Sequence, residues 1–494
     1  MPELPSDPEL IREMRERVAH ARREVVVAIA EGRSTDAWRA AQIALESRGR
    51  FGIRMGLERS TALLAALGSP EQRVRGALVA GTNGKGSVVA LVSAALRAAG
   101  VRHATTPKPH LVSYRERVQI DGRPLPPLPF AQSVARALEA ADQIEARVGP
   151  ATEFELLVGA VFDALREKEI TTAIVEVGLG GRLDATHAWD GGVAVVTNVG
   201  LDHQQYLGDT IEAIANEKAA IIMRGNHAVT GASERGGALD VIRHHAQRAG
   251  APLTIAHAGA TRSLGRSGIE VELEGRGRVH VGLLGRHQGA NAAVAAATLD
   301  ALGKAGIVSV NDEQLRHGFA TARWAGRLEL IPGAFGSGDE RDLLLDGAHN
   351  EDGAAALAAS LGDLAPELRG SNGTHGAPLV MILAVMADKS VAELCTALAA
   401  APELRTAQVI CTSVGDVRSL APEQLVAQVR TAGLGASVRR AADPLEALMI
   451  AAQNNGPVIV AGSLYLVGAI RSELMRRGTL PDDGSRDDVA GSPI

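Results

Sequence analysis

Residues 79–96, VAGTNGKGSVVALVSAAL, place the tightest constraint on the fold of this chain, because they predict a strand, a glycine-rich turn and a helix in direct succession. Glycine lets a backbone turn tightly and approach a bound group closely, and the turn contains Gly81, Gly84 and Gly86. The amides at the start of the following helix would point at an anion, which the helix dipole also attracts. Since Lys85 adds a positive charge at the same place, the stretch predicts a phosphate-binding loop.

The loop differs from the usual phosphate-binding pattern, G-x-x-x-x-G-K-[ST]. Val79 stands where the first glycine is expected, and Gly86 stands where a magnesium-binding hydroxyl is expected. A glycine-rich turn with a solvated Lys85 is the alternative interpretation of the loop taken alone. The strand before the loop and the helix after it favour phosphate binding.

The rest of the chain alternates apolar strands with helices, after a helical stretch at 6–47. Runs such as TAIVEVG at 172–178 predict buried parallel strands. Residues 253–285 alternate with period two, which is typical of an antiparallel hairpin. A second series of strands and helices follows residue 330. We therefore predict an α/β protein. A P-loop-type ATPase domain, with a mostly parallel sheet and a small antiparallel sheet, precedes a C-terminal Rossmann-like parallel α/β domain.

Composition excludes several classes of function. The net charge of the 494 residues is −6 and only 2% are aromatic, which argues against binding nucleic acid. The sequence contains no uncharged apolar run long enough to span a membrane and no secretion signal at its start, so we expect a cytoplasmic protein.

Several polar residues have no obvious use in packing. Glu176 lies inside an apolar strand, where a carboxylate is costly unless it is paired or bound to metal. Asp202 and His203 follow a strand, where α/β proteins place ligand-binding groups, and so do Asp346 and His349. Taken singly, these residues could equally be a structural ion pair or structural histidines.

Together, these segments resemble the folylpolyglutamate synthase/dihydrofolate synthase family, within the ATP-dependent Mur-type amide ligases. The resemblance spans roughly residues 50–470. It rests on GLERSTALLAALGSP, VAGTNGKGSV, PHLVSYRERVQIDG, FELL, EVGLGGRLDAT, LDHQQYLGDTIEAIANEKAAII, GRHQGANA, GRLE and LDGAHNEDG, in this order. The glycine at 86 indicates the folate branch, because the Mur ligases proper carry GT-x-GK-T-T.

The resemblance implies a role for each matching residue. ATP would be bound by the loop and by residues from later segments: Gly81, Thr82, Asn83, Gly84, Lys85, Gly86, Ser87, Asn291, Arg327, Asp346 and His349. Two Mg²⁺ ions would be held by Ser87, Glu176, His203 and Lys218, with Lys218 carbamylated. The catalytic set would be Lys85, His203, Lys218 and Arg327.

The pterin substrate would lie against Thr152, Glu153, Phe154, Glu155, Leu183, Asp184 and Ala185. Phe154 could stack on a flat ring, and Asp184 could accept hydrogen bonds from ring nitrogens. The alternative for Phe154 is a place in the core of a helix.

The expected organisation follows from the same matches. It comprises an N-terminal helical segment at 1–48, an ATP-binding and pterin-binding domain at 49–325, a C-terminal ligase domain at 326–478 and a disordered tail at 479–494.

One position departs from the family pattern. The family usually reads S-P-H-L after the first helix, and that serine binds magnesium, whereas this chain has Lys108 in its place. An ammonium group cannot bind a cation. Either Ser87, Thr105 or Thr106 supplies the hydroxyl, or water does, or Lys108 contacts phosphate directly.

The implied reaction is ATP-dependent addition of L-glutamate to dihydropteroate, to reduced folates or to both, through an acyl phosphate. A monomer without membrane or nucleic-acid partners is expected. Two other interpretations stay open: a Mur-type or poly-γ-glutamate ligase that acts on another acid, and a nucleotide-binding regulator without ligase activity.

Overall fold

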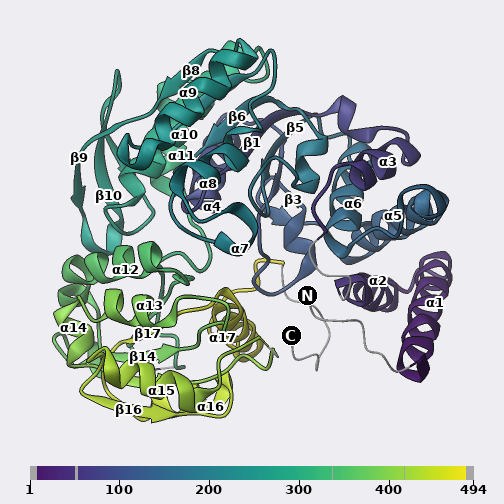
Figure 1. Cartoon of the computed structure of the whole chain (residues 1–494). Helices are drawn as coiled ribbons and strands as arrows, with labels where there is room; N and C mark the ends of the chain where they lie inside the picture. The colour runs from purple at the N-terminus through teal and green to yellow at the C-terminus, as the bar shows by residue number, and fades with distance from the viewer. Residues whose placement is uncertain (1–7, 50–53, 337, 417, 485–494) are drawn as a thin grey trace.

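The computed structural model describes the chain except residues 1–7, 50–53, 337, 417 and 485–494, and its described residues form three sheets (Figure 1). The largest sheet is parallel in its centre, and its strands, in spatial order, are β4 (Arg123–Pro124), β3 (Gln119–Ile120), β2 (Ala104–Thr106), β5 (Thr172–Glu176), β1 (Arg75–Ala80), β6 (Gly192–Val196), β7 (His227–Thr230) and β8 (Leu253–Ile255). Only β3 and β4, at one edge, run antiparallel to their neighbours.

Helices cover both faces of this sheet, because alternate residues of β1 enter different cores. Leu78 and Ala80 pack into one buried cluster, and Ala77 and Val79 pack into another. The helices of this half are α1 (Pro8–Ala30), α2 (Ser34–Gly49), α3 (Glu58–Ala66), α4 (Lys85–Ala98), α5 (Pro127–Val148), α6 (Glu153–Glu167), α7 (Gln204–Leu207), α8 (Ile211–Ala219), α9 (Ala238–Ala249), α10 (Gln288–Lys304) and α11 (Asp312–Thr321).

A small antiparallel sheet, β9 (Ala258–Ser263), β10 (Ile269–Leu273) and β11 (Gly277–Val281), follows β8. Its apolar face, with Val271 and Val279 paired across two strands, packs into the same cluster as α4 and α10. The predicted hairpin is confirmed as β10 and β11, with β9 as a third strand, but the first residues of the predicted range, 253–255, form β8 of the parallel sheet instead.

The third sheet has the order β12 (Glu329–Pro332), β13 (Asp342–Leu345), β17 (Val458–Ala461), β14 (Val380–Leu383), β15 (Gln408–Cys411) and β16 (Ser437–Arg440), and all pairs except β12–β13 are parallel. Its helices are α12 (Glu351–Leu364), α13 (Val391–Leu398), α14 (Pro402–Arg405), α15 (Pro422–Thr431), α16 (Pro444–Ala452) and α17 (Leu464–Arg477). Leu344 enters one core, and Leu343 and Leu345 enter the other, so this sheet is also covered on both faces.

The predicted fold class is confirmed, with a mostly parallel large sheet, a small antiparallel sheet and a C-terminal parallel α/β unit. The helical stretch predicted at 6–47 is two helices, because the backbone turns at Gly32, whose φ is +70°. Most of the tail predicted at 479–494 lies outside the described residues. Within the described part of the chain, no helix combines the length and apolarity needed to cross a bilayer.

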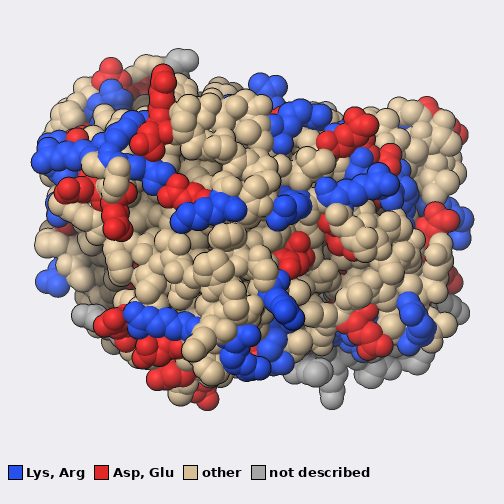
Figure 2. All heavy atoms as spheres, turned by 90° about the horizontal axis from the view of Figure 1, so that it is seen from above, with Lys and Arg blue, Asp and Glu red and all other residues tan. Residues whose placement is uncertain are grey.

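Charged side chains of both signs are interspersed on the face in Figure 2.

The parallel strands direct their carboxyl ends to one edge of the large sheet. There Gly81 follows β1, Val177 follows β5 and Thr197 follows β6, and the amides of Val177 and Thr197 donate to carbonyls of β1. The phosphate-loop segment is thus fixed between the two neighbouring strands.

The position of the phosphate loop is also fixed by α4, because this helix begins in the loop and packs closely on α11. A β-carbon placed on Gly318 of α11 would lie 2.5 Å from the Ala95 backbone of α4. We expect Gly318→Ala to lower the free energy of unfolding by about 1–3 kcal/mol in a denaturant titration, because backbone atoms cannot move aside locally.

Gly362→Ala is the matched control, since Gly362 lies in a helix with nothing within 4 Å of the added carbon. This change should raise the free energy of unfolding by about 0.5–1 kcal/mol through helix propensity. Equal stability of the two variants would contradict the close contact between α4 and α11.

Candidate active site

A cavity of about 800 Å³ opens where the carboxyl ends of β1, β5 and β6 face the loop between β13 and α12. Its wall includes the residues that the resemblance placed in the ATP, metal and pterin sites, but not the alternatives Thr105 and Thr106: Gly81, Thr82, Asn83, Gly84, Lys85, Gly86, Ser87, Thr152, Glu153, Phe154, Glu155, Glu176, Leu183, Asp184, Ala185, His203, Lys218, Asn291, Arg327, Asp346 and His349. The structure brings these residues together, and their individual roles stay predictions.

The phosphate loop is held by hydrogen bonds to the residues that follow β6. The amide of Asn83 donates to Asn198 Oδ1 (2.8 Å), and Thr197 Oγ1 donates to the Asn83 carbonyl (2.6 Å). Lys85 Nζ donates to the carbonyls of Gly81 and Thr82, at 2.8 and 3.1 Å. Burial lowers the pKa of Lys85, while the charges of Glu176 and Asp202 act in the opposite direction. The loop therefore surrounds a lysine to which no carboxylate of the described residues is bonded.

Trp324 accounts for glycine at position 86. A β-carbon there would lie 2.7 Å from Trp324 Nε1, so a serine or threonine would collide with the indole ring. Ser87, one position later in α4, is buried and lines the cavity. The hydroxyl that the usual pattern places at 86 is thus available only one residue further along.

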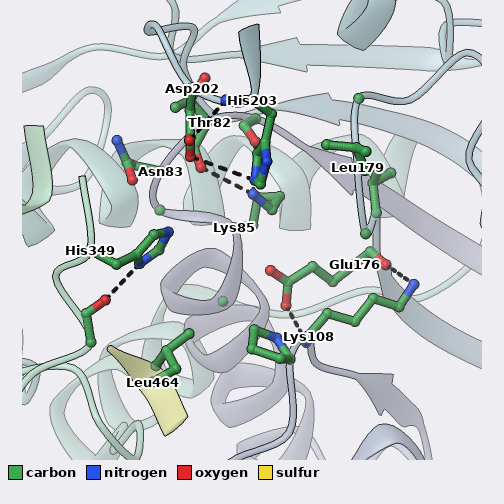
Figure 3. Close-up of a pocket in the computed structure, with 18 of the residues that line it drawn as sticks. Thr82, Asn83, Lys85, Lys108, Glu176, Leu179, Asp202, His203, His349 and Leu464 are labelled. Atoms are coloured by element: carbon green, nitrogen blue, oxygen red, sulfur yellow. Dashed lines mark hydrogen bonds and ion pairs between the residues drawn. The ribbon is translucent and has the colours of Figure 1, made fainter. Parts of the chain in front are cut away.

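Glu176 ends β5 with its carboxylate in the cavity (Figure 3). Glu176 Oε2 accepts a hydrogen bond from the amide of Lys108 (3.0 Å). Burial raises the pKa of Glu176, and the charge of Lys85 opposes that shift. A buried carboxylate with one oxygen lacking a described donor has the chemistry of a ligand for a hard divalent cation.

The Lys108 side chain runs away from the phosphate loop. Its Nζ donates to the main-chain carbonyl of Glu176 (2.5 Å) and lies 4.5 Å from the centroid of the Phe154 ring. In Figure 3 the Glu176 side chain separates this ammonium from Lys85. The geometry therefore disfavours the alternative that Lys108 contacts phosphate, because the nitrogen points to the side of Glu176 away from Lys85.

Lys218 and His203 complete the predicted metal set. Lys218, in α8, is only 4% exposed, and its ammonium makes no hydrogen bond or ion pair with any described residue. Burial, together with the charge of Lys85, lowers the pKa of Lys218 to about 7. Over the described ranges, no three His, Cys, Asp or Glu side chains converge on one point. A site made of Glu176 and His203 would therefore need a further oxygen ligand, which a carbamate on Lys218 would supply.

The C-terminal unit reaches the site through contacts that the sequence analysis did not predict. Asn350 Nδ2 donates to Asn83 Oδ1 (3.2 Å) and to Asp202 Oδ2 (3.3 Å), and Lys389 Nζ lies 3.0 Å from Asp202 Oδ1. Burial alone would raise the pKa of Asp202, but the charges of His203 and Lys389 hold it well below its usual value. These contacts join the start of α12 and the loop between β14 and α13 to the phosphate-loop side of the cavity.

Asp346 and His349 lie on the same side. Asp346 accepts from the amides of Leu328 and Ala348, at 2.8 and 2.9 Å. Burial lowers the pKa of His349 to about 4, so its ring is neutral at pH 7. Because His349 Nδ1 lies 2.8 Å from the Gly347 carbonyl, that nitrogen carries the proton and Nε2 is left as an acceptor.

Asp184 and Glu155, which were predicted to bind the pterin, already accept hydrogen bonds from other groups of the protein. Asp184 Oδ2 accepts from the amides of Gly178 and Leu179, at 3.0 and 2.8 Å, and Oδ1 accepts from the amide and hydroxyl of Thr186, at 3.0 and 2.5 Å. Because these four donors fill the carboxylate, the expectation that Asp184 accepts hydrogen bonds from a substrate ring does not hold.

The carboxylate of Glu155 also has partners within the protein. It accepts from the amide of Thr152 (2.8 Å) in a capping box at the start of α6, and it pairs with Arg59 (2.9 Å). Glu155 and Asp184 therefore shape the wall of the cavity.

Comparison with known proteins identifies both halves of the chain. Residues 79–299 match the Mur ligase middle domain, and residues 335–474 match the dihydrofolate synthetase C-terminal domain. The dihydrofolate synthase/folylpolyglutamate synthase of Bacillus subtilis is 36% identical over 336 residues, which cover 66% of this chain and 76% of that protein. The chain belongs to the dihydrofolate synthase/folylpolyglutamate synthase family.

Solved structures of this family share the fold. Mycobacterium tuberculosis folylpolyglutamate synthase, complexed with ADP and AMPPCP, superposes with a TM-score of 0.77 at 29% identity, over 88% of this chain and 99% of that one. The Yersinia pestis bifunctional folylpolyglutamate synthase/dihydrofolate synthase, complexed with AMPPNP and a Mn ion, gives 0.72 at 27% identity, over 90% and 98%.

The isolated ammonium of Lys218 predicts a pH-dependent cost in stability. Between the ordinary lysine pKa of 10.5 and the folded value of about 7, the unfolded chain holds a proton that the folded chain lacks. The free energy of unfolding therefore falls as the pH is lowered from 10 to 7, by at most about 1.4 kcal/mol per pH unit. Below pH 7 both states are protonated, so this slope of the free energy against pH disappears. Lys218→Met should remove this slope in denaturant titrations done without nucleotide, metal or CO₂.

Lys304→Met, at the exposed end of α10, is the control and should keep the slope of the wild type. If the free energies of unfolding of the wild type and of Lys218→Met change in parallel from pH 10 to 7, Lys218 is not buried as an isolated amine.

Proposed function

We propose that this protein is an ATP-dependent ligase that joins the amine of L-glutamate to a carboxylate of dihydropteroate, of a reduced folate or of both. Family membership supports the reaction class. The observation that carries the proposal is that residues from all the matching segments, far apart in the chain, line one cavity. A nucleotide-binding regulator has no need for the Glu176, His203 and Lys218 group beside a phosphate loop.

The reaction has two steps. An oxygen of the acceptor carboxylate attacks the γ-phosphorus of ATP, and the bond to the bridging oxygen breaks to release ADP. The glutamate amine then attacks the acyl carbon, phosphate leaves with the carboxylate oxygen, and the amine loses a proton.

Each side of the cavity would contribute to these steps. Lys85 and the amides at the start of α4 would bind the phosphates, and Arg327 would neutralise charge on the transferred group. Divalent ions held by Glu176, His203 and Ser87 would polarise the phosphoryl oxygens. The contacts of Asn350 and Lys389 with the phosphate-loop side would close the cavity and keep water from the acyl phosphate.

We also propose that Lys218 is carbamylated. Carbamylation needs a neutral amine, and the lowered pKa of Lys218 provides one near pH 7. A carbamate carbonyl resonance from ¹³C-bicarbonate, lost in Lys218→Met, would report the modification, and identical spectra for the two proteins would refute it. We further propose, on the resemblance to the family, that the enzyme acts as a monomer in the cytoplasm.

We expect Lys85→Ala to reduce ATP turnover by at least about a hundredfold while the protein stays folded, because the loop loses its one lysine. A coupled assay for ADP measures the rate, and circular dichroism measures the fold. Lys304→Ala removes an exposed lysine from α10 and should retain full turnover. Near-normal turnover by folded Lys85→Ala would rule out the phosphate-loop assignment.

The acceptor is tested by the same ADP assay with dihydropteroate, a reduced monoglutamyl folate and a muramyl-peptide precursor, each supplied separately. We expect ADP release only when magnesium, L-glutamate and a pteroate-type acid are all present. Turnover only with the muramyl compound would reassign the protein to the Mur-type ligases. ADP release that is indifferent to glutamate would remove it from the ligases altogether.

A further inference from the structure

The cavity wall beside Phe154 contains two cationic side chains that no described carboxylate pairs with. Lys108 and Arg117 both line the main cavity, and both also line the small apolar pocket behind Phe154. Arg117 Nε donates to His110 Nδ1 (3.0 Å). Glu153 is the carboxylate whose charge acts most on Arg117, and it accepts a hydrogen bond from the Tyr114 hydroxyl (2.8 Å).

The Lys108 ammonium bonds only to neutral groups in the described part of the chain. Its partners are the Glu176 main-chain carbonyl and the face of the Phe154 ring. A charge removed from water without a counter-ion is costly. Two such cations on one wall of a ligand cavity indicate that the ligand supplies the negative charge.

Because Lys108 Nζ is bonded to the main-chain carbonyl of Glu176, the length of the Glu176 side chain limits how far the ammonium lies from the Glu176 carboxylate. The Glu176 carboxylate, through a divalent ion, would face the carboxylate that is phosphorylated. Lys108 Nζ binds the main-chain carbonyl of the same residue, and three carbons separate that carbonyl from the side-chain carboxylate. The α- and γ-carboxylates of a glutamyl group are separated by the same three carbons. A glutamyl acceptor could therefore place its γ-carboxylate at Glu176 and its α-carboxylate at Lys108.

We propose that Lys108, supported by Arg117, is a specificity-determining residue that binds a second carboxylate of the acceptor. The enzyme would then prefer folates that end in glutamate to dihydropteroate, which ends in a single benzoate carboxylate. This inference rests on the proposed function and names the acceptor class within it. The backbone amide of Lys108 holds Glu176 whatever the side chain is, so side-chain variants test the ammonium alone.

The test compares the binding of pteroate and pteroylglutamate by isothermal titration calorimetry, with Mg²⁺ and AMPPNP present so that no turnover occurs. The wild type should bind pteroylglutamate at least about tenfold more tightly than pteroate, since one charge-assisted hydrogen bond distinguishes them. Lys108→Met should bring the ratio of the two Kd values close to one, and Lys108→Arg should largely keep the preference. The control Lys304→Met should keep the wild-type ratio.

An equal loss of affinity for both ligands in Lys108→Met would overturn the inference, because Lys108 would then only maintain the cavity. A wild type that prefers pteroate would also overturn it. These results leave the ligase assignment intact if ADP is still released with either acceptor. If the wild type binds neither ligand and releases no ADP with either acceptor, the proposed function itself fails.

Discussion

Burial of opposite charges at the carboxyl ends of β1 and β5 is the constraint on which the rest of the structure depends. Burial of the charged form is costly for both Lys85 and Glu176, and each shifts the pKa of the other toward its charged form. The parallel pairing of β1 and β5 brings both groups to one edge, with Val79 opposite Glu176 in the register. Carbonyls accept hydrogen bonds from the lysine and an amide donates to the carboxylate, so each of the two charges is bonded to neutral groups among the described residues.

The second unit depends on this arrangement, because it meets the first at the same edge. Asn350, at the start of α12, and Lys389, after β14, both reach Asp202, which follows β6. Asp346 and His349, from the same unit, line the cavity as well. Because the cavity lies between the two units, closure of one unit on the other could control the entry of water to it.

The sequence predicted those features whose cause is local. A strand, glycines and a helix within 79–96 are sufficient to predict the phosphate loop, and the place of Glu176 inside an apolar strand made it a candidate for ion pairing or metal binding. Features set by distant contacts were missed. Glycine at 86 is explained only by Trp324, and Asp184 appeared free until the structure showed four donors on its carboxylate. Lys389 has no local signal, and the exposed edge strand β16 lacks the apolar pattern of its neighbours.

The central claim is that this cavity activates an acid as an acyl phosphate, and oxygen transfer tests it most directly. The acceptor is labelled with ¹⁸O in the carboxylate that forms the amide, and released phosphate is analysed by mass spectrometry after a single round of ligation. We expect one labelled oxygen in phosphate for each amide formed, because the attacking oxygen leaves with phosphorus. Phosphate that carries no label while the amide accumulates would contradict it.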